Sequence, residues 1–386
     1  MKILQIAPCY VDIYNETGGV ANIVRQICLK LEKNRINTVL ICSNTELGKT
    51  VARSGKIEYS DYLTIYVVKQ YKNPLLGPTK KLHSILKLFD GISLAHIHTC
   101  FSAITEYSMK YLTGKNIPCI FTPHGKLSPS MYSNNKLFKD LYFRIKSKRN
   151  LNHVNSIVAS SSNEINYMKA LGINGQFSYI HNGYSHFDSI ETHQNYWKLD
   201  SKSYLLFLGY LDPRKQPDLL IQAFSKSMAR KNFKLVLAGP DLYGFRKTLE
   251  KLVKSENLEI NKHVIFTDRV EGEAKWDLLK NAKGLFLSSK GEGWPVVIAE
   301  AIGAKIPCVI SKECNFSEIN QLQLGIEVSD FKIENWTSAI DQICSNKEQN
   351  VRFEINLNKF AEQFSWDSIT NEWISKYKTM LNEART

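Results

Sequence analysis

The chain has 386 residues and a formal net charge of +13, with 43% hydrophobic, 11% aromatic and 23% charged residues. This length predicts two domains, and no apolar run reaches the roughly 18–20 residues that a membrane-spanning helix needs. The opening segment MKILQIAPCY reads as a strand, and its apolar run is too short for a signal peptide. The eight cysteines are scattered without a CxxC pair, which favours buried free thiols in a reducing cytoplasm over disulfides or zinc ligands.

Strand-like runs in the first half of the chain alternate with helical patterns. Strands are expected at 2–8, 37–43, 63–69, 94–100, 119–125 and 156–161, and the clearest helix at 21–34. Gly18 and Gly19 precede this helix, and two glycines there let the backbone approach an anion at the helix N-terminus. His124 and Gly125 end the strand at 119–125, where the histidine is either structural or part of a site.

Positive charge is concentrated in the first half of the chain. Residues 1–200 hold 24 Lys and Arg against 13 Asp and Glu, whereas residues 201–386 hold 26 against 24. The excess peaks in KLFKDLYFRIKSKRN at 136–150, where apolar residues recur at roughly helical spacing. Such a helix either lies on an anionic membrane surface or has a solvated outer face and packs on its own domain. Nucleic acid is a weaker alternative, because no helix-turn-helix, RNP or zinc pattern accompanies the charge.

A polar segment at 185–203 interrupts the alternation of strands and helices, which then restarts. Strands are expected at 203–210, 233–240, 263–268, 284–289 and 307–311, with helices at 217–230 and 274–283 between them. Apolar strands that alternate with amphipathic helices predict parallel sheets covered on both faces. The sequence therefore predicts an α/β fold with two doubly wound domains.

Polar groups also lie between strands and helices in the second half, where open α/β sheets bind their ligands. Arg214 and Lys215 precede a helix that starts near residue 218, and cations at such a position suit a phosphate. The stretch GEGWPVVIAE at 291–300 carries Glu292 and Glu300 at the two ends of an apolar segment. The LAGPD turn at 237–241 is expected to be architectural.

Several nucleotide-binding and hydrolase motifs are absent. The sequence has no complete GxGxxG, since Val296 takes the third glycine position of GEGWPVV, and no GxxxxGK[ST] or GxSxG. No Asp-x-Asp pair is present to hold a nucleotide through a divalent metal. We therefore expect an anionic ligand to be neutralised without metal or cofactor, by the Lys215 turn and the helix that begins after Pro295.

The order of these elements resembles glycosyltransferase family 4, whose members are retaining enzymes of the GT-B fold. The series comprises the double glycine, His124-Gly125, Asn182-Gly183, the Lys215 turn, LAGP, Glu292-x7-Glu300 and the closing FSWDSITNEWISKY. The resemblance implies two Rossmann-like domains that face a central cleft, an acceptor-side domain at 1–187 and a donor-binding domain at 204–365. A linker at 188–203 would join them, and a last helix at 366–386 would cross back to the first domain.

The resemblance also implies a role for each candidate residue. Glu292 would contact the donor sugar, Glu300 the nucleotide ribose, and Lys215 the leaving diphosphate. His124 would steady positive charge on the reacting sugar, and the Gly18-Gly19 loop would close the cleft. The implied catalytic set is His124, Lys215 and Glu292, and the implied donor-binding set is Gly18, Gly19, Arg214, Lys215, Gly293, Trp294, Pro295, Val296 and Glu300.

Two positions depart from the family pattern. Tyr210 stands where an arginine usually follows the strand glycine, and Arg214 is the candidate to replace that arginine. Asp268 stands where glycine is usual after the strand on the nucleobase side. The Gly-Trp-Pro-Val tract after Glu292 favours a UDP-sugar over a GDP-sugar as the donor.

The resemblance thus implies a metal-independent transferase that moves a hexosyl or N-acetylhexosaminyl group from a nucleotide-sugar to a saccharide or lipid-linked acceptor, with retention of configuration. Bacterial surface-polysaccharide or glycolipid synthesis would fit this, in the cytoplasm or with the helix at 136–149 on the inner face of the cell membrane. Two alternatives stay open. One is a non-catalytic GT-B protein that binds nucleotide or acts as a scaffold, which Tyr210 supports, and the other is a GT-B sugar-nucleotide epimerase.

Overall fold

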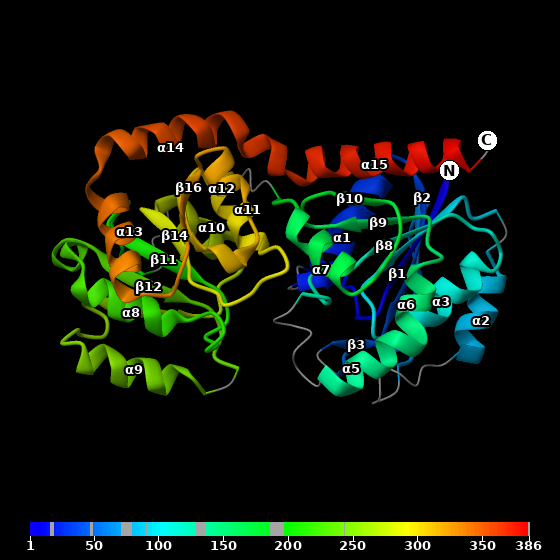
Figure 1. The fold of residues 1–386 in the computed structure, drawn as a ribbon, viewed down its shortest axis with the longest axis horizontal. Helices are drawn as coiled ribbons and strands as arrows, with labels where there is room; N and C mark the ends of the chain where they lie inside the picture. Colours follow the sequence, from blue (N-terminus) through cyan, green and yellow to red (C-terminus); the bar gives the residue numbers. More distant parts are fainter. Residues whose placement is uncertain are drawn as a thin grey trace. The chain divides into compact units, whose positions relative to one another are not determined.

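The computed structural model describes residues 1–15, 19–46, 49–70, 79–89, 91–128, 136–185, 197–242 and 244–384. The chain forms two compact units (Figure 1): unit 1 consists of Met1–Asn182 together with Trp366–Thr386, and unit 2 of Gly183–Ser365. Much of the predicted linker at 188–203 lies outside the described residues. The last helix of the chain therefore belongs to unit 1, although all of unit 2 precedes it in the sequence.

The sheet of unit 1 has eight strands in the order β10-β9-β8-β7-β1-β2-β6-β5. The strands are β1 (Lys2–Ala7), β2 (Asn37–Ser43), β5 (Gly55–Ser60), β6 (Leu63–Val68), β7 (Leu94–His98), β8 (Cys119–Thr122), β9 (Ser156–Ala159) and β10 (Phe177–Tyr179), and a separate short pair is formed by β3 (Thr45–Glu46) and β4 (Lys49–Thr50). Neighbours in the large sheet are parallel except β5 and β6, which form an antiparallel edge. The direction of strand order changes between β1 and β7.

Helices cover both faces of this sheet (Figure 1). They are α1 (Gly19–Lys33), α2 (Thr79–Lys87), α3 (Ala103–Thr113), α5 (Lys136–Tyr142), α6 (Lys148–Leu151), α7 (Ser162–Ala170) and α15 (Trp366–Glu383), with a π-helical turn at Phe143–Ser147. Alternate strand residues divide between the faces: Leu4 and Ile6 lie in one apolar core with α3, and Ala7 in another with α1. Helix α15 packs beside α1, where Lys30 and Asp367 form an ion pair of 2.6 Å.

The sheet of unit 2 has six strands, all parallel, in the order β13-β12-β11-β14-β15-β16. The strands are β11 (Tyr204–Leu208), β12 (Lys234–Ala238), β13 (Val264–Asp268), β14 (Gly284–Leu287), β15 (Cys308–Ser311) and β16 (Gly325–Val328). The helices are α8 (Pro217–Lys226), α9 (Arg246–Ser255), α10 (Gly272–Asn281), α11 (Val296–Gly303), α12 (Glu318–Gln321), α13 (Ile333–Ser345) and α14 (Lys347–Phe360). One apolar core runs through the unit and includes β11, β12, β14 and β15.

The two doubly wound sheets confirm the α/β fold class predicted from the sequence. One predicted helix was too long: instead of 217–230, α8 ends at Lys226. Ser227 is extended (φ −74°, ψ 147°), and its hydroxyl accepts a hydrogen bond of 2.9 Å from the N–H of Ala229. Serine thereby caps a separate 3-10 turn rather than continuing the helix. Throughout the described ranges, no helix combines the length and apolar character needed to span a bilayer.

Candidate active site

The first candidate site lies at the carboxyl edge of the sheet of unit 2. Strands β11 and β14 are neighbours, but the chain continues from β11 toward β12 and from β14 toward β15, on the opposite side. The loops that follow the two strands, 209–216 and 288–295, therefore begin side by side. This is the switch point at which open α/β sheets bind their ligands.

Lys215 and Glu292, one from each loop, form an ion pair. Their side chains are 22% and 16% exposed, so the pair is largely shielded from water. The Ser288 hydroxyl lies within hydrogen-bond distance of the carbonyls of Lys215 (3.0 Å) and Gln216 (2.8 Å), and this fixes the end of the first loop against β14. The sequence predicted both charged residues for the site but not that they would contact each other.

A third segment, which follows β15, holds the backbone of Glu292. The N–H of Glu292 donates to the carbonyl of Glu313 (3.0 Å), and the Asn315 carboxamide donates to the carbonyl of Glu292 (2.7 Å). Asn315 adopts a left-handed conformation with φ of 55°, which asparagine tolerates better than most residues. The Glu292 carboxylate is therefore positioned by backbone bonds on both sides as well as by its ion pair.

The turn from Gly293 to Val296 leads into helix α11. Pro295, one of the implied donor-binding residues, is the N-cap residue, and because proline has no N–H it cannot donate a backbone hydrogen bond to a ligand. The backbone N–H donors here are those of the other residues of the turn and of the start of α11, where the N–H of Ile298 already donates to the carbonyl of Pro295 (3.0 Å). The Trp294 side chain is buried and packs on Phe316, with ring centroids 4.9 Å apart, so it anchors the turn in the core of unit 2.

Glu300, on α11, forms an ion pair with Lys275 of α10 (Nζ to Oε1 2.8 Å). The two side chains are 14% and 16% exposed. This contact fixes one oxygen of the carboxylate that was expected to bind a ribose. Lys275 was not singled out from the sequence, because nothing in its helical pattern indicates a partner on the next helix.

The structure shows the surroundings of Tyr210 and Asp268, the two positions that depart from the family pattern, and of Arg214. The Tyr210 side chain is 43% exposed. The guanidinium of Arg214 contacts the carboxylate of Asp212 (2.7 Å), so the charge proposed to replace the missing arginine is already matched by an acid. Asp268 has φ of 58°, a conformation natural to glycine, and its carboxylate pairs with Arg246 (2.5 Å).

The second group of candidate residues lies in unit 1, at the end of β8. His124 and Gly125 follow this strand with φ of 51° and 76°. A left-handed conformation costs a residue such as histidine about 1–2 kcal/mol, and strain of this kind is concentrated at functional sites. The N–H of Gly125 donates a hydrogen bond to the carboxylate of Glu164 on α7. The same carboxylate accepts a hydrogen bond of 2.9 Å from the N–H of Ser160. Burial raises the pKa of this carboxyl group.

The His124 ring contacts a second histidine. Its Nε2 lies 2.9 Å from Nδ1 of His98, the last residue of β7. Burial, with a smaller contribution from the charge of Lys126, lowers the pKa of His124 to about 3, so the ring is neutral at neutral pH. In the described part of the chain, the buried Nδ1 of His124 has no hydrogen-bond partner. A buried ring nitrogen without a partner is a candidate contact for a ligand.

Solved structures share the fold of the whole chain. Sucrose-phosphate synthase of Thermosynechococcus elongatus matches with a TM-score of 0.79 at 17% identity, over 99% of this chain and 100% of the other. HepE of Anabaena, in complex with UDP and glucose, matches with a TM-score of 0.72 at 15% identity, over 98% of this chain and 100% of the other. At these identities the likeness shows the fold alone.

Two family models match the chain in succession. The model of Glycosyltransferase Family 4 matches residues 17–186, and that of Glycosyl transferases group 1 matches residues 188–360. The chain therefore carries two successive glycosyltransferase domains, which together cover residues 17–360. An uncharacterized glycosyltransferase of Methanocaldococcus jannaschii is 30% identical over 47% of this chain, and the match spans 46% of that relative, about half its length.

The double glycine expected to contact the donor in a GT-B glycosyltransferase is only partly described. Gly18 lies outside the described residues. Gly19 is the first residue of α1 and has φ of 61°, a conformation that a side chain would strain. Gly239 in the LAGPD turn is architectural, as predicted, because a Cβ there would lie 1.9 Å from the carbonyl oxygen of Gly209.

Sequence reasoning missed three residues that support the candidate sites: Lys275, Asn315 and His98. A signal for His98 was present, because His96 and His98 alternate in the apolar strand LAHIH, and alternate strand residues share a face. No comparable pattern marks the other two, whose partners lie on separate elements.

The cysteines of the chain are free thiols, as the sequence predicted, and six of the eight are buried. Burial raises the pKa of Cys119 and Cys314 to about 12, so these thiols are not ionised at neutral pH. Among the residues that the structure describes, no three His, Cys, Asp or Glu side chains are grouped to hold a metal ion.

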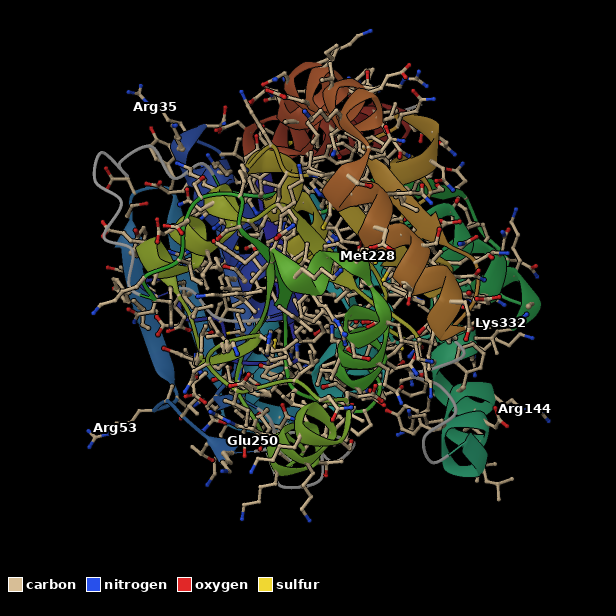
Figure 2. All side chains as sticks on the ribbon, turned by 90° about the vertical axis from the view of Figure 1, so that its left-hand side faces the viewer. Arg35, Arg53, Arg144, Met228, Glu250 and Lys332 are labelled. Carbon is tan, nitrogen blue, oxygen red and sulfur yellow. The ribbon has the colours of Figure 1, made fainter. Side chains whose placement is uncertain are left out.

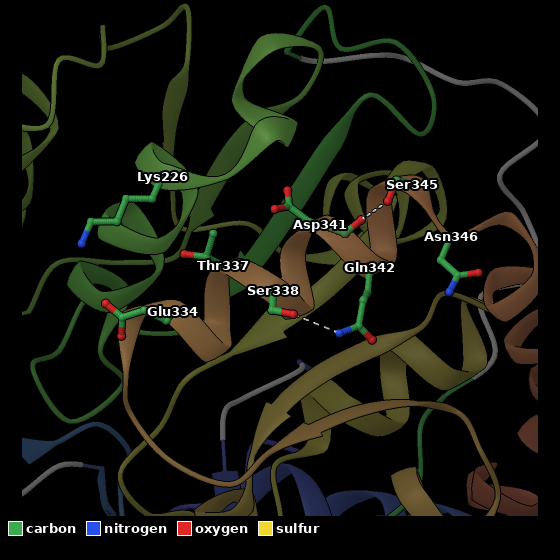
Figure 3. Close-up of a pocket in the computed structure, with 8 residues that line it drawn as sticks. All are labelled: Lys226, Glu334, Thr337, Ser338, Asp341, Gln342, Ser345 and Asn346. Carbon is green, nitrogen blue, oxygen red and sulfur yellow. Dashed lines mark hydrogen bonds between the residues drawn. The ribbon is translucent and has the colours of Figure 1, made fainter.

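A shallow hollow of about 550 Å³ lies between α8 and α13 (Figure 3). It is lined by Lys226, Glu334, Thr337, Ser338, Asp341, Gln342, Ser345 and Asn346. Asp341 is already engaged, since its carboxylate accepts hydrogen bonds from the hydroxyl of Ser227 (2.5 Å) and the N–H of Met228 (3.0 Å). The hollow lies at the carboxyl end of α8, whereas Lys215 precedes its amino end, so the two are separate features.

Proposed function

We propose that this chain transfers a hexosyl or N-acetylhexosaminyl group from a nucleotide-sugar to a saccharide or lipid-linked acceptor, with retention of anomeric configuration and without a metal ion. The observation that carries the proposal is the shielded Lys215–Glu292 ion pair at the switch point of β11 and β14. It combines a cation for a departing phosphate with a carboxylate for sugar hydroxyls.

The reaction explains why these groups belong together. Cleavage of the bond between a sugar and a nucleoside diphosphate builds negative charge on the phosphate and positive charge on the sugar. A preorganised cation at the leaving group lowers the barrier, by about 3–4 kcal/mol for a single well-placed donor. Lys215 is the residue for this role, with the first turn of α11 as a further site for an anion.

UDP-sugars are the proposed donors. The Gly-Trp-Pro-Val tract after Glu292 supports this, and HepE of Anabaena, which shares the fold, was solved with UDP and glucose. The shielded Glu300 carboxylate would accept hydrogen bonds from the hydroxyls of the ribose. UDP and GDP have the same ribose, so this contact does not distinguish the two bases.

The experiment that tests the function is a screen of UDP-glucose, UDP-N-acetylglucosamine, UDP-galactose and GDP-mannose. A donor at 100 times its Kd adds about 2.7 kcal/mol to the free energy of unfolding, a rise in Tm of roughly 5–10 °C. We expect one UDP-sugar to give this shift, and to release UDP equally with and without EDTA. The anomeric proton of a transferred sugar then reports retention.

Three results of this screen would contradict the proposal. Stabilisation without cleavage of any donor would favour a non-catalytic binding protein. Conversion of one UDP-sugar into another, without net release of UDP, would favour an epimerase. Loss of cleavage in EDTA, restored by manganese, would contradict the metal-free mechanism.

Glu300→Gln should weaken donor binding without a large change in turnover. The substitution keeps the shape of the side chain but removes the charge-assisted hydrogen bond to the ribose, typically about 1.5–3 kcal/mol. We expect the donor KM to rise about tenfold or more and kcat to stay within about threefold. Lys275→Met, which leaves the carboxylate without its ion pair, should lower the Tm as well. Unchanged KM in Glu300→Gln would remove this residue from the donor site.

The basic segment at 136–151 presents apolar and cationic side chains together. Leu137, Leu141 and Ile145 follow one another at intervals of four residues and are 88%, 59% and 63% exposed. Phe143 instead packs into the core of unit 1, which corrects the expectation that the apolar residues of this segment share one side. The exposed row is thus smaller than the sequence pattern indicated.

Exposed cations accompany this row: Arg144, Lys146 and Arg149. Figure 2 shows Arg144 extending away from the ribbon. We infer that the segment binds an anionic membrane surface, because apolar side chains among cations suit the boundary between headgroups and acyl chains. A lipid-linked acceptor would be met at such a surface.

We expect the protein to bind vesicles that contain phosphatidylserine, but not pure phosphatidylcholine vesicles, in a salt-sensitive manner. Each cation at the surface contributes about 1 kcal/mol, so changing Arg144, Lys146 and Arg149 to glutamate should weaken binding at least about 100-fold. Sedimentation with vesicles measures this.

A matched control makes the same charge change in unit 2, at the exposed residues Lys247, Lys251 and Lys254 of α9. Equal weakening by both triple variants would mean that net charge, not this segment, drives binding. Equal recovery with both lipid types at low salt would favour a soluble acceptor.

A further inference from the structure

A chain of buried polar side chains lies on one face of the sheet of unit 1. Gln5 of β1 is the parallel partner of His96 on β7, and His98 is the partner of Thr122 on β8. Paired and alternate strand residues point to the same face, so all four side chains share it. This face also contacts α15, because the Trp373 ring lies 4.5 Å from that of His96.

Hydrogen bonds connect these residues from α15 to His124. The Tyr377 hydroxyl lies 2.8 Å from Nδ1 of His96 and 3.1 Å from Nε2 of Gln5. On the other side of the amide, Oε1 of Gln5 lies 2.8 Å from Nε2 of His98. Nδ1 of His98 then lies 2.9 Å from Nε2 of His124. The chain is continuous and ends at the ring expected to meet the substrate.

The three histidine rings in this chain are neutral. Burial lowers the pKa of His96 and of His98 well below the usual value, and lowers that of His124 to about 3. A neutral imidazole has one nitrogen that donates and one that accepts. Each bond along the chain therefore fixes the direction of the next.

The amide of Gln5 sets this direction. Its NH2 donates to the Tyr377 oxygen, so its carbonyl accepts from His98, whose proton must lie on Nε2. Nδ1 of His98 is then an acceptor, and His124 donates to it from Nε2. The remaining nitrogen, Nδ1 of His124, carries a lone pair. If every hydrogen bond in the chain were donated in the opposite direction, the oxygen and nitrogen of the Gln5 amide would have to exchange places. His124 would then carry its proton on Nδ1, as a buried N–H without a partner in the described residues.

We propose that Tyr377, Gln5 and His98 are positioning residues that hold His124 as its Nε2–H tautomer, so that the bare Nδ1 accepts a hydrogen bond from a substrate hydroxyl. This inference rests on the proposed function and on the role that the family resemblance implies for His124, which would lie at the reacting sugar. A lone pair aimed at the substrate suits the positive charge that develops on the sugar, whereas an N–H at the same position would oppose it.

The variant that tests the chain is Tyr377→Phe. It keeps the ring that packs on Trp373 and His96 and removes only the hydroxyl. The matched control is Tyr204→Phe in unit 2, which removes an equally buried hydroxyl that donates to the carbonyl of Leu278 (2.7 Å). Tyr204→Phe loses one buried hydrogen bond and Tyr377→Phe loses two, but only Tyr377→Phe interrupts the chain to His124.

Two readouts are needed. In the full chain labelled with 15N-histidine, two-bond 1H–15N spectra report which ring nitrogen carries the proton, and they do so without any substrate. We expect the Nε2–H form for His124 in the wild type and a mixture of both forms in Tyr377→Phe. In the transfer assay, Tyr377→Phe should lower kcat about tenfold with the donor KM unchanged, as for one lost hydrogen bond in the transition state, and Tyr204→Phe should not.

The results separate this inference from the proposed function. A proton on Nδ1 of His124 in the wild type overturns the inference, whatever the activity. Wild-type kcat and an unchanged His124 spectrum in Tyr377→Phe also overturn it. A wild type that cleaves no nucleotide-sugar, yet shows the Nε2–H form of His124, would overturn the function and leave the hydrogen-bond chain intact.

Discussion

Lys215→Ala is expected to lower kcat for sugar transfer by about 10²–10³-fold, the loss typical of removing one preorganised group that stabilises developing negative charge. The substitution also leaves Glu292 without its ion pair, so a carboxylate would face the leaving phosphate without compensation. Both effects raise the barrier. Steady-state kinetics with the donor identified in the screen measures the change, and thermal unfolding shows whether the variant is folded.

Arg214→Ala is the matched control for this prediction. Arg214 is adjacent in sequence and carries the same charge, but its side chain is 57% exposed and pairs with Asp212. We expect its removal to change kcat and the donor KM by no more than about fivefold, as for exposed ion pairs. An equal loss in the two variants would show that Arg214 replaces the family arginine absent at Tyr210.

Glu292→Gln is expected to lower kcat by about 100-fold while the donor KM stays within about threefold. Glutamine keeps the size of the side chain and the bonds of the residue 292 backbone to Glu313 and Asn315, but it loses the charge that is proposed to face the sugar. An interaction that strengthens as positive charge develops affects turnover more than binding.

Glu300→Gln is the variant with which Glu292→Gln is compared. The two substitutions are chemically identical and lie on the same loop-and-helix unit, yet the first should act on kcat and the second on KM. If both variants changed KM alone, Glu292 would be a second ribose or phosphate contact. Wild-type transfer by Glu292→Gln would remove it from the site.

Most of the fold was predictable because the strands of unit 2 and the centre of unit 1 are buried on both faces. Such strands appear in the sequence as short apolar runs, as in YLLFL of β11 and KLVLA of β12. The strands that were missed have weak patterns. β5 (GKIEYS) is largely exposed and lies at the antiparallel edge, β3 and β4 have two residues each, β10 has three, and β16 (GIEV) is a sheet edge with two half-buried residues.

Lys215 and Glu292 could be predicted as site residues because each is a charged residue that follows a strand and precedes a helix. Their ion pair was not predictable, because it joins residues 77 positions apart and depends on β11 lying next to β14 in the sheet. Local patterns carry no information about strand order. The same reason hid the contact between Glu300 and Lys275, which depends on how α10 and α11 pack.

Helix α15 has a consequence for the order in which the protein folds during synthesis. Gln5 and His96 lie within the first hundred residues, yet their shared partner Tyr377 is made almost last. Until α15 is made and packs on this face of the sheet, both groups lack this hydrogen-bond partner, and the face stays open to water. At 5–20 residues per second, the ribosome needs roughly 10–40 s to make unit 2 in between. Unit 2 is continuous in sequence and can complete its core first, so the half of the protein that begins the chain is the last to reach its final stability.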